Sequence, residues 1–337
     1  MIVVITGASA GVGRAAARAF AQEGWDVGLI ARGEAGLEAA AEEVRAHGRR
    51  ALVLPLDVAD SEAVEAAAER VERELGPIDV WVNDAMESVF SPVAEMTADE
   101  YRRVTEVNYL GYVHGTLAAL RRMRVRDRGV IVQVGSALAY RSIPLQSAYC
   151  GSKHAIVGFT DSLRCELIHD NSHVRITAVH MPALNTPQFG WVRSRLPGRA
   201  QPVPPIFEPE VAARAILHVA KHPRRELFVG GSTLLAVWGQ KFLPNVLDWY
   251  LGKSGYDAQQ TREPRPNRAD NIDAPLDERE DRGARGRFEG QARTVAPVLE
   301  LSIHRRAVAA VLSLGVTTVA IGTLLRRDTE PSPRRSS

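Results

Sequence analysis

The chain has 337 residues, a formal net charge of +2, and 45% hydrophobic residues. This length allows one large domain or two ordinary ones, and the hydrophobic content suffices for a sizeable core. Acidic and basic residues are intermixed, which argues against a nucleic-acid binder that works through a basic surface. The two cysteines, Cys150 and Cys165, argue against a disulfide scaffold, and their spacing predicts no metal site.

Short β-branched runs alternate with longer helical patterns over most of the chain. Strands are predicted at 2–5, 26–31, 51–54, 78–82, 129–135, 174–180 and 226–229, and helices at 12–23, 34–47, 61–75, 98–125 and 147–169. Apolar strands that alternate with helices are typical of a parallel sheet covered by helices on both faces. We therefore predict an α/β fold with a doubly wound, Rossmann-like sheet over residues 1–252.

A glycine-rich turn, Thr6-Gly7-Ala8-Ser9-Ala10-Gly11-Val12-Gly13, joins the first predicted strand to the first predicted helix. Its glycines have the spacing G-x-x-x-G-x-G. Such glycines let backbone N–H groups approach a pyrophosphate, and the helix N-terminus adds its positive end. The residues expected to bind the phosphates of a dinucleotide are Gly7, Ser9, Ala10, Gly11, Val12 and Gly13.

The end of the second strand predicts which dinucleotide binds. Leu29-Ile30-Ala31-Arg32 offers no acidic residue for a free ribose 2′-hydroxyl, whereas Arg32 can pair with a 2′-phosphate. NADP(H) is therefore favoured over NAD(H), the alternative being that Arg32 is only a surface residue. Asp57, after the third strand, is placed to meet the adenine, and Asn83 and Ala85 follow the fourth strand at the same edge.

Three side chains suited to carbonyl reduction come together by topology. Ser136 follows a strand, and Tyr149 and Lys153 lie four residues apart on the next helix, so they share one face. Reduction requires an acid beside the carbonyl oxygen while hydride reaches the carbon. A nearby ammonium lowers the pKa of a tyrosine, as Lys153 can do for Tyr149. The hydroxyl of Ser136 can hold the substrate oxygen.

Taken together, these motifs resemble those of the short-chain dehydrogenases/reductases of the compact, single-domain type. The matching segments, within about residues 1–230, are Thr6–Gly13, Asp57-Val58, Asn83-Asp84-Ala85-Met86, Asn108, Ser136 and Tyr149-Cys150-Gly151-Ser152-Lys153. The resemblance implies that Tyr149 is the catalytic acid/base, with Lys153 lowering its pKa and binding the nicotinamide ribose. It also implies that Ser136 orients the substrate and that Asn108 supports a water-linked proton relay.

The same resemblance implies further contacts and an assembly. Asp57 and Val58 would lie at the adenosine, and the segment from Pro182 to Thr186 would close on the cofactor, with Thr186 near the carboxamide. A dimer or tetramer would be built from the helices that carry Asn108 and Tyr149.

Two departures from the family pattern concern cofactor packing rather than proton transfer. The family commonly has Asn-Asn-Ala-Gly after the fourth strand, where this chain has Asp84 and Met86. The usual Pro-Gly after the sixth strand is Pro182-Ala183.

Two other functions stay open. A nucleotide-sugar epimerase or dehydratase-like enzyme is disfavoured by the glycine spacing and by the lack of a large C-terminal substrate domain. A non-catalytic, NADP-sensing interaction protein is disfavoured because Asn108, Ser136, Tyr149 and Lys153 are all present. The favoured substrate is a moderately apolar carbonyl or alcohol compound. The proline- and aromatic-rich stretch 187–209 either caps that substrate or is a packed loop.

Composition changes after residue 253. Residues 262–299 hold eight arginines and eight acidic residues, so 253–304 is expected to be a flexible polar linker. Residues 305–327 contain an uncharged run, 307–325, which would span about 28 Å as a helix at ~1.5 Å per residue. It is expected to cross or associate with a membrane, the alternative being an amphipathic or buried helix; 328–337 is expected to be a disordered tail. No secretory signal precedes the first strand, so the catalytic domain is expected in the cytoplasm.

Overall fold

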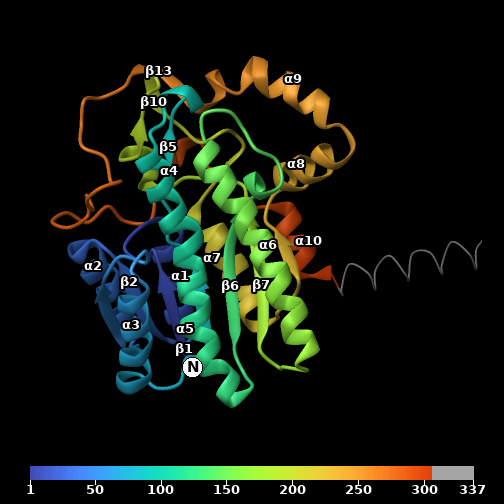
Figure 1. Cartoon of the computed structure of the whole chain (residues 1–337). Coiled ribbons are helices and arrows are strands. Elements are labelled where there is room, and N and C mark those ends of the chain that lie inside the picture. The colour runs from blue at the N-terminus through green and yellow to red at the C-terminus, as the bar shows by residue number, and fades with distance from the viewer. Residues whose placement is uncertain (306–337) are drawn as a thin grey trace, which may run out of the picture.

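The computed structural model describes residues 1–305 and contains a seven-stranded parallel sheet in the order β12-β7-β6-β4-β1-β2-β3 (Figure 1). Its strands are β1 (Ile2–Thr6), β2 (Asp26–Ala31), β3 (Ala51–Pro55), β4 (Val80–Asn83), β6 (Val130–Ser136), β7 (Arg175–Met181) and β12 (Glu226–Phe228). The strand order reverses beside β1, which pairs with β2 on one side and β4 on the other. Ligands of open parallel sheets bind beyond the carboxyl ends of the strands at such a reversal. The predicted doubly wound α/β fold is confirmed.

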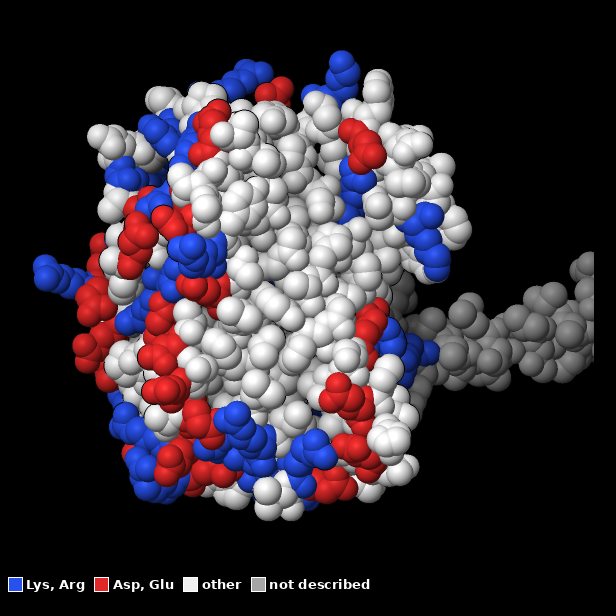
Figure 2. Space-filling view, in the orientation of Figure 1, with Lys and Arg blue, Asp and Glu red and all other residues white. Residues whose placement is uncertain are grey.

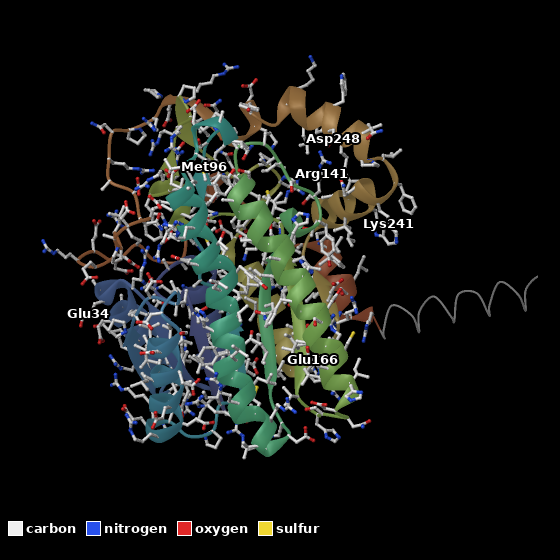
Figure 3. The ribbon with its side chains drawn as sticks, in the orientation of Figure 1. Glu34, Met96, Arg141, Glu166, Lys241 and Asp248 are labelled. Carbon is white, nitrogen blue, oxygen red and sulfur yellow. The ribbon has the colours of Figure 1, made fainter. Side chains whose placement is uncertain are left out.

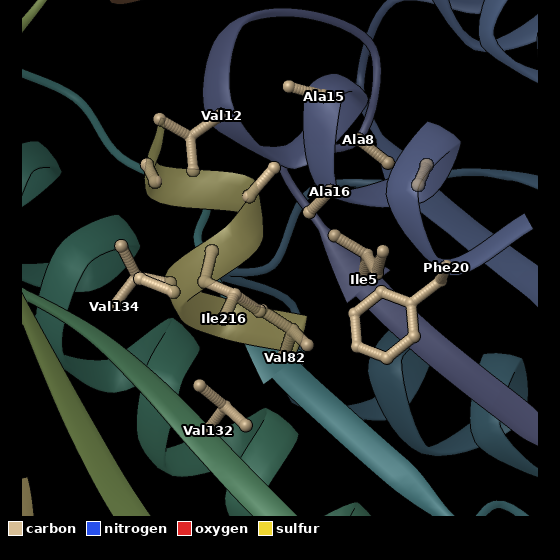
Figure 4. Packing of buried hydrophobic residues seen from close by; sticks show 14 of the residues in the cluster. Ile5, Ala8, Val12, Ala15, Ala16, Phe20, Val82, Val132, Val134 and Ile216 are labelled. Carbon is tan, nitrogen blue, oxygen red and sulfur yellow. The ribbon is translucent and has the colours of Figure 1, made fainter. Parts of the chain in front are cut away.

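Helices cover both faces of the sheet because successive strand residues point to opposite sides. Val3 and Ile5 pack toward α1 (Gly11–Gln22), α2 (Glu34–Ala46) and α7 (Pro209–Lys221). Figure 4 shows this layer, with Ile5 of the sheet beside Phe20 of α1 and with Ile216 of α7 farther along the same layer. Ile2 and Val4 pack on the other face, toward α3 (Ser61–Glu74), α5 (Gly111–Arg126) and α6 (Ser147–His169).

The helix predicted over 98–125 is divided into three pieces. A capping box between Thr97 and Glu100 starts α4 (Ala98–Thr105), a π-helical turn follows at Glu106–Leu110, and α5 continues from Gly111. A side chain at Gly111 would lie 2.7 Å from a methyl carbon of Val58, so glycine lets this helix approach the loop after β3. π-Helical turns inside longer helices are frequent at functional sites, and Asn108 lies within this one.

Short strand pairs and a helical hairpin lie above the carboxyl edge of the sheet. The pairs are β5 (Val89–Phe90) with β9 (Arg193–Ser194), β8 (Ala183–Leu184) with β11 (Ile206–Phe207), and β10 (Gly198–Ala200) with β13 (Gln260–Pro264). The hairpin consists of α8 (Gly231–Phe242) and α9 (Pro244–Ser254). These elements cover the space in which the predicted site lies.

The structure differs from the flexible linker expected over 253–304. Ile272, Phe288 and Leu299 are each at most 4% exposed, β13 pairs with β10, and α10 (Pro297–Ile303) contacts β12. The composition of residues 253–304 does not reveal this packing, because the buried apolar residues are few and widely spaced among charged residues. The folded unit therefore continues past residue 252 to the end of the described chain.

The predicted membrane segment, 307–325, and the expected tail, 328–337, lie outside the described residues. Among residues 1–305, no helix combines the length and the apolar character that crossing a bilayer requires.

Candidate active site

A cavity of about 430 Å³ lies at the carboxyl edge of the sheet, where the strand order reverses. Most of the residues predicted from the sequence line it: Gly7, Ser9, Ala10, Gly11, Val12, Arg32, Asp57, Val58, Ala85, Ser136, Tyr149, Lys153, Pro182 and Thr186. Gly13, Asn83 and Asn108 do not line it. One end of the cavity lies between the glycine-rich turn and Arg32. The other end lies under α9.

The glycine-rich turn depends on backbone conformations and close approaches that other residues would oppose. Gly7 and Gly11 have φ values of +72° and +57°, in the left-handed region. A side chain at Gly13 would overlap the carbonyl of Gly7, so Gly13 permits the start of α1 to pack against the turn. Ala10, the N-cap of α1, supplies no side-chain acceptor to the helix. The turn is therefore shaped to receive an anion.

Lys153 and Tyr149 lie one helical turn apart on α6, facing the end of β6. The Nζ atom of Lys153 is 5.6 Å from the centre of the Tyr149 ring. It donates hydrogen bonds to the carbonyl oxygen of Val134 at 2.8 Å and to the hydroxyl of Tyr112 at 3.0 Å. The α6 helix thus brings an ammonium beneath the tyrosine that the sequence singled out.

The ionisation of Tyr149 is controlled mainly by burial. Burial raises the pKa of Tyr149 above its ordinary value of 10, and a hydrogen bond with Ser136 acts in the opposite direction. Burial lowers the pKa of Lys153, whereas the neighbouring Asp84 carboxyl raises it. The cavity therefore keeps Tyr149 protonated at neutral pH, as a proton donor requires.

Asn108 lies behind the cavity wall. Its side chain accepts the N–H of Glu87 at 2.7 Å and donates to the carbonyl of the same residue at 2.8 Å. It also donates to the hydroxyl of Ser152 on α6 at 3.2 Å. Asn108 therefore ties the loop after β4 to the helix of Tyr149 and Lys153.

Asn83 points into the core instead of the cavity. It accepts from the indole N–H of Trp81 at 2.9 Å and donates to Thr116 at 3.1 Å and to Gln133 at 2.9 Å. The structure does not bring this side chain to the position predicted for a cofactor contact. Asp84, the next residue, lines the cavity and accepts a hydrogen bond from the N–H of Gly13.

The end of the cavity at Arg32, where the sequence predicts the adenosine, holds two ion pairs. Arg32 pairs with Glu87 at 2.5 Å, and Arg103 pairs with Asp57 at 2.6 Å. Glu87 is only 3% exposed, and burial raises its pKa to about 8 despite the two nearby guanidinium groups. Burial alone would raise the pKa of Asp57, but hydrogen bonds, the larger from Arg103, hold that pKa below its ordinary value. Sequence reasoning missed Glu87 because no local motif marks it.

The opposite end is lined by largely apolar side chains. The stretch 187–209 contributes residues such as Phe189, Trp191 and Val203 to this lining. Sequence reasoning missed Tyr250 and the other lining residues of α9 and the turn after it. Arg141 fastens α9 over the cavity by pairing with Asp248 at 2.7 Å (Figure 3). This end therefore suits a moderately apolar group.

A dinucleotide-type fold with a serine, a tyrosine and a lysine at its carboxyl edge defines the class of dehydrogenases and reductases that use a nicotinamide cofactor. The chain belongs to the short-chain dehydrogenase family, whose model matches residues 1–196. It is therefore an NAD(P)-dependent oxidoreductase.

Known proteins that are similar to this chain are named as oxidoreductases or dehydrogenases. The chain is 33% identical to the uncharacterized oxidoreductase YxnA of Bacillus subtilis over 78% of this chain and 74% of that one. An alcohol dehydrogenase from Thermococcus sibiricus, solved with 5-hydroxy-NADP, is 28% identical and has a TM-score of 0.59, covering 67% of this chain and 94% of that one. A short-chain dehydrogenase from Mycobacterium paratuberculosis, solved with NAD, is 23% identical with the same TM-score, covers 67% of this chain and 95% of that one, and shares the fold.

Proposed function

We propose that the protein is an NADP(H)-dependent enzyme that interconverts a carbonyl and an alcohol, with Tyr149 as the general acid and base. The observation that carries this proposal is the placement of Ser136, Tyr149 and Lys153 together on one cavity with the glycine-rich turn. The substrate is a small, moderately apolar carbonyl or alcohol compound, because the end of the cavity under α9 is lined mainly by apolar side chains.

The residues of this chain hold the substrate oxygen and move its proton. When bound, the nicotinamide supplies or accepts the hydride. Ser136 donates a hydrogen bond to the carbonyl oxygen, and the phenol of Tyr149 gives that oxygen its proton in the reduction direction. Lys153 stabilises the phenolate that remains. Asn108 holds the loop after β4 in place and supports the return of a proton.

A cofactor-oxidation screen tests the reaction. Aldehydes, ketones, quinones and ketoacyl thioesters are offered with NADPH, and absorbance at the nicotinamide band is followed. Turnover of at least one apolar carbonyl compound is expected. An enzyme that binds NADPH but turns over none of these classes would support the alternative of a cofactor-sensing protein.

We expect Arg32→Ala to weaken the binding of NADPH selectively. Arg32 lines the adenosine end and can donate two charge-assisted hydrogen bonds to a 2′-phosphate. Their loss should cost about 1.5–3 kcal/mol, or roughly tenfold to a hundredfold in Kd. Titration calorimetry with NADPH and NADH on the same variant measures this. Equal losses for the two cofactors, or a wild type that prefers NADH, would contradict the assignment.

We further propose that the protein is a homodimer or homotetramer built on α5 and α6. Figure 2 shows a broad area with few charges where these helices lie in Figure 1. Leu117 of α5 is 41% exposed, and side chains at Gly151 and Gly158 of α6 would meet no atom within 4 Å. Small residues of this kind let two helices approach closely.

Light scattering tests this assembly. Leu117→Glu should lower the molecular mass in solution toward that of one chain, 36.8 kDa. Val246→Glu, at a position 56% exposed on α9, is the control and should leave the assembly intact. A wild type that already has the mass of one chain would end the proposal.

Membrane attachment through 307–325 stays a prediction from the sequence. An uncharged run of 19 residues approaches the length that a bilayer requires. The full chain should sediment with membranes after a carbonate wash, with the catalytic domain on the cytoplasmic side, and a chain that ends after Arg305 should not. That end point keeps Leu299, which is fully buried. Recovery of the washed full chain in the supernatant would refute the prediction.

A further inference from the structure

The segment that follows β13 crosses the adenosine end of the cavity. In Figure 1 it is the orange chain that descends from β13 toward α2. We call residues 271–283 the strap. Its residues Asn271, Leu276 and Asp277 line the cavity. The buried Ile272, 1% exposed, anchors its beginning in an apolar cluster, and Ala284, just beyond its end, is 5% exposed in the main core. The strap thus forms one wall of the site and is held by buried residues at its two ends.

At the ribose end, carbonyl oxygens of the strap accept hydrogen bonds from groups suited to a phosphate. Arg32 donates through Nη1 to the carbonyl of Ile272 at 3.2 Å and through Nη2 to that of Asn271 at 2.5 Å. In the first turn of α2, the N–H of Gly36 donates to the carbonyl of Asp277 at 3.1 Å. A guanidinium beside a helix N-terminus is a phosphate-binding arrangement. Here the strap already engages both groups, and Arg32 also pairs with the carboxylate of Glu87.

The same strap reaches the glycine-rich turn. The N–H of Gly11 donates to the carbonyl of Gly283 at 3.2 Å. Two residues earlier, the carboxylate of Asp281 pairs with Arg14 on α1, and Arg14 also pairs with Glu43 at 3.0 Å. One continuous segment therefore covers donors at both the ribose end and the pyrophosphate end.

We propose that the strap competes with NADP(H) and must release Arg32 and the start of α2 before a 2′-phosphate can bind. The inference rests on the proposed NADP(H) dependence. A phosphate makes stronger, charge-assisted hydrogen bonds than carbonyl oxygens do, so the exchange favours the cofactor. Only molecules with an open strap can bind NADP(H). The apparent affinity for NADP(H) is therefore reduced in proportion to the fraction of molecules that are open. NADH lacks the 2′-phosphate and does not require the release of Arg32, so the strap sets the relative affinity for the two cofactors.

The test weakens the attachment of the strap by substitution and measures cofactor affinity. It also measures the amide exchange of the strap in the wild type. Asp281→Ala removes the ion pair to Arg14, which keeps Glu43. Glu280→Ala is the matched control, because its carboxylate pairs within the strap itself, with Arg282 at 2.9 Å. Calorimetry should show Kd for NADPH lowered about fivefold in Asp281→Ala, as expected if most molecules are closed, and Kd for NADH lowered less than twofold. Glu280→Ala should match the wild type.

Amide hydrogen exchange gives a second readout on the unaltered full-length chain. NADPH should speed exchange in peptides from 271–283. Slower exchange there would mean that the strap closes on the bound cofactor, which overturns the proposal. In the calorimetry, the proposal is also overturned if Asp281→Ala gains equal affinity for NADH and NADPH, or gains no affinity for NADPH. If neither cofactor binds any form, the proposed function fails. If NADPH binds the wild type tightly without speeding strap exchange, only the strap proposal fails.

Discussion

Replacing Tyr149 by phenylalanine is expected to lower turnover by at least about a hundredfold, the scale of a lost general acid. Phenylalanine keeps the ring that packs at the start of α6 but removes the hydroxyl that is proposed to give a proton to the substrate oxygen. The hydroxyl of Ser136 remains, so substrate can still be held. The affinity for NADPH should change little, because the phosphate and ribose contacts proposed here come from other residues.

Tyr140→Phe is the control for this experiment. The hydroxyl of Tyr140 donates to Glu226 at 2.7 Å, and the residue does not line the cavity. Both variants lose one tyrosine hydroxyl, but only one of these lies in the site. Steady-state kinetics on a substrate from the screen should therefore separate them. Turnover near that of the wild type in Tyr149→Phe would remove this residue from its role.

The raised pKa of Tyr149 also fixes the sign of a pH effect. Because burial raises this pKa above 10, the protonated phenol predominates at neutral pH. In the reduction direction the rate should stay level through neutral pH and fall as pH rises through the pKa of Tyr149. Any lowering of that pKa by Lys153 in the complex would move the fall to lower pH.

Local spacing made part of the site predictable. The glycine-rich turn and the pair Tyr149 and Lys153 are each defined within one strand-turn-helix or one helical turn, so the sequence alone places them. The parallel topology then brings Ser136 to the same edge. The strap and α9 could not be placed this way, because their positions depend on contacts across more than a hundred residues. Arg141 with Asp248 is one such contact.

The direction in which a side chain points was also beyond sequence reasoning. Arg32 lines the cavity, and its partner Glu87 lies on another strand connection and carries no motif. Asn83 follows the right strand at the right edge, but its amide turns toward α5. The difference matters because removing a core amide lowers the stability of the fold, whereas removing a cofactor ligand weakens cofactor binding.

Asn83→Ala is therefore expected to destabilise the fold whether or not cofactor is present. Asn83 is fully buried, and its removal leaves the indole N–H of Trp81 and the amide oxygen of Gln133 without these partners. Each unsatisfied buried group costs about 1–3 kcal/mol, so leaving these two unsatisfied should lower the free energy of unfolding by about 2–6 kcal/mol. That is a large part of the ~5–15 kcal/mol that stabilises a typical domain.

Denaturant unfolding of the cofactor-free protein measures this loss, with Asn245→Ala as the control. Asn245 lies exposed near the start of α9, so its removal should change the unfolding free energy by less than about 0.5 kcal/mol. The folded fraction of Asn83→Ala should bind NADPH nearly as tightly as the wild type, because the amide does not reach the cavity. The opposite pattern, with stability unchanged and NADPH binding weakened, would show that Asn83 contacts the cofactor as the sequence first indicated.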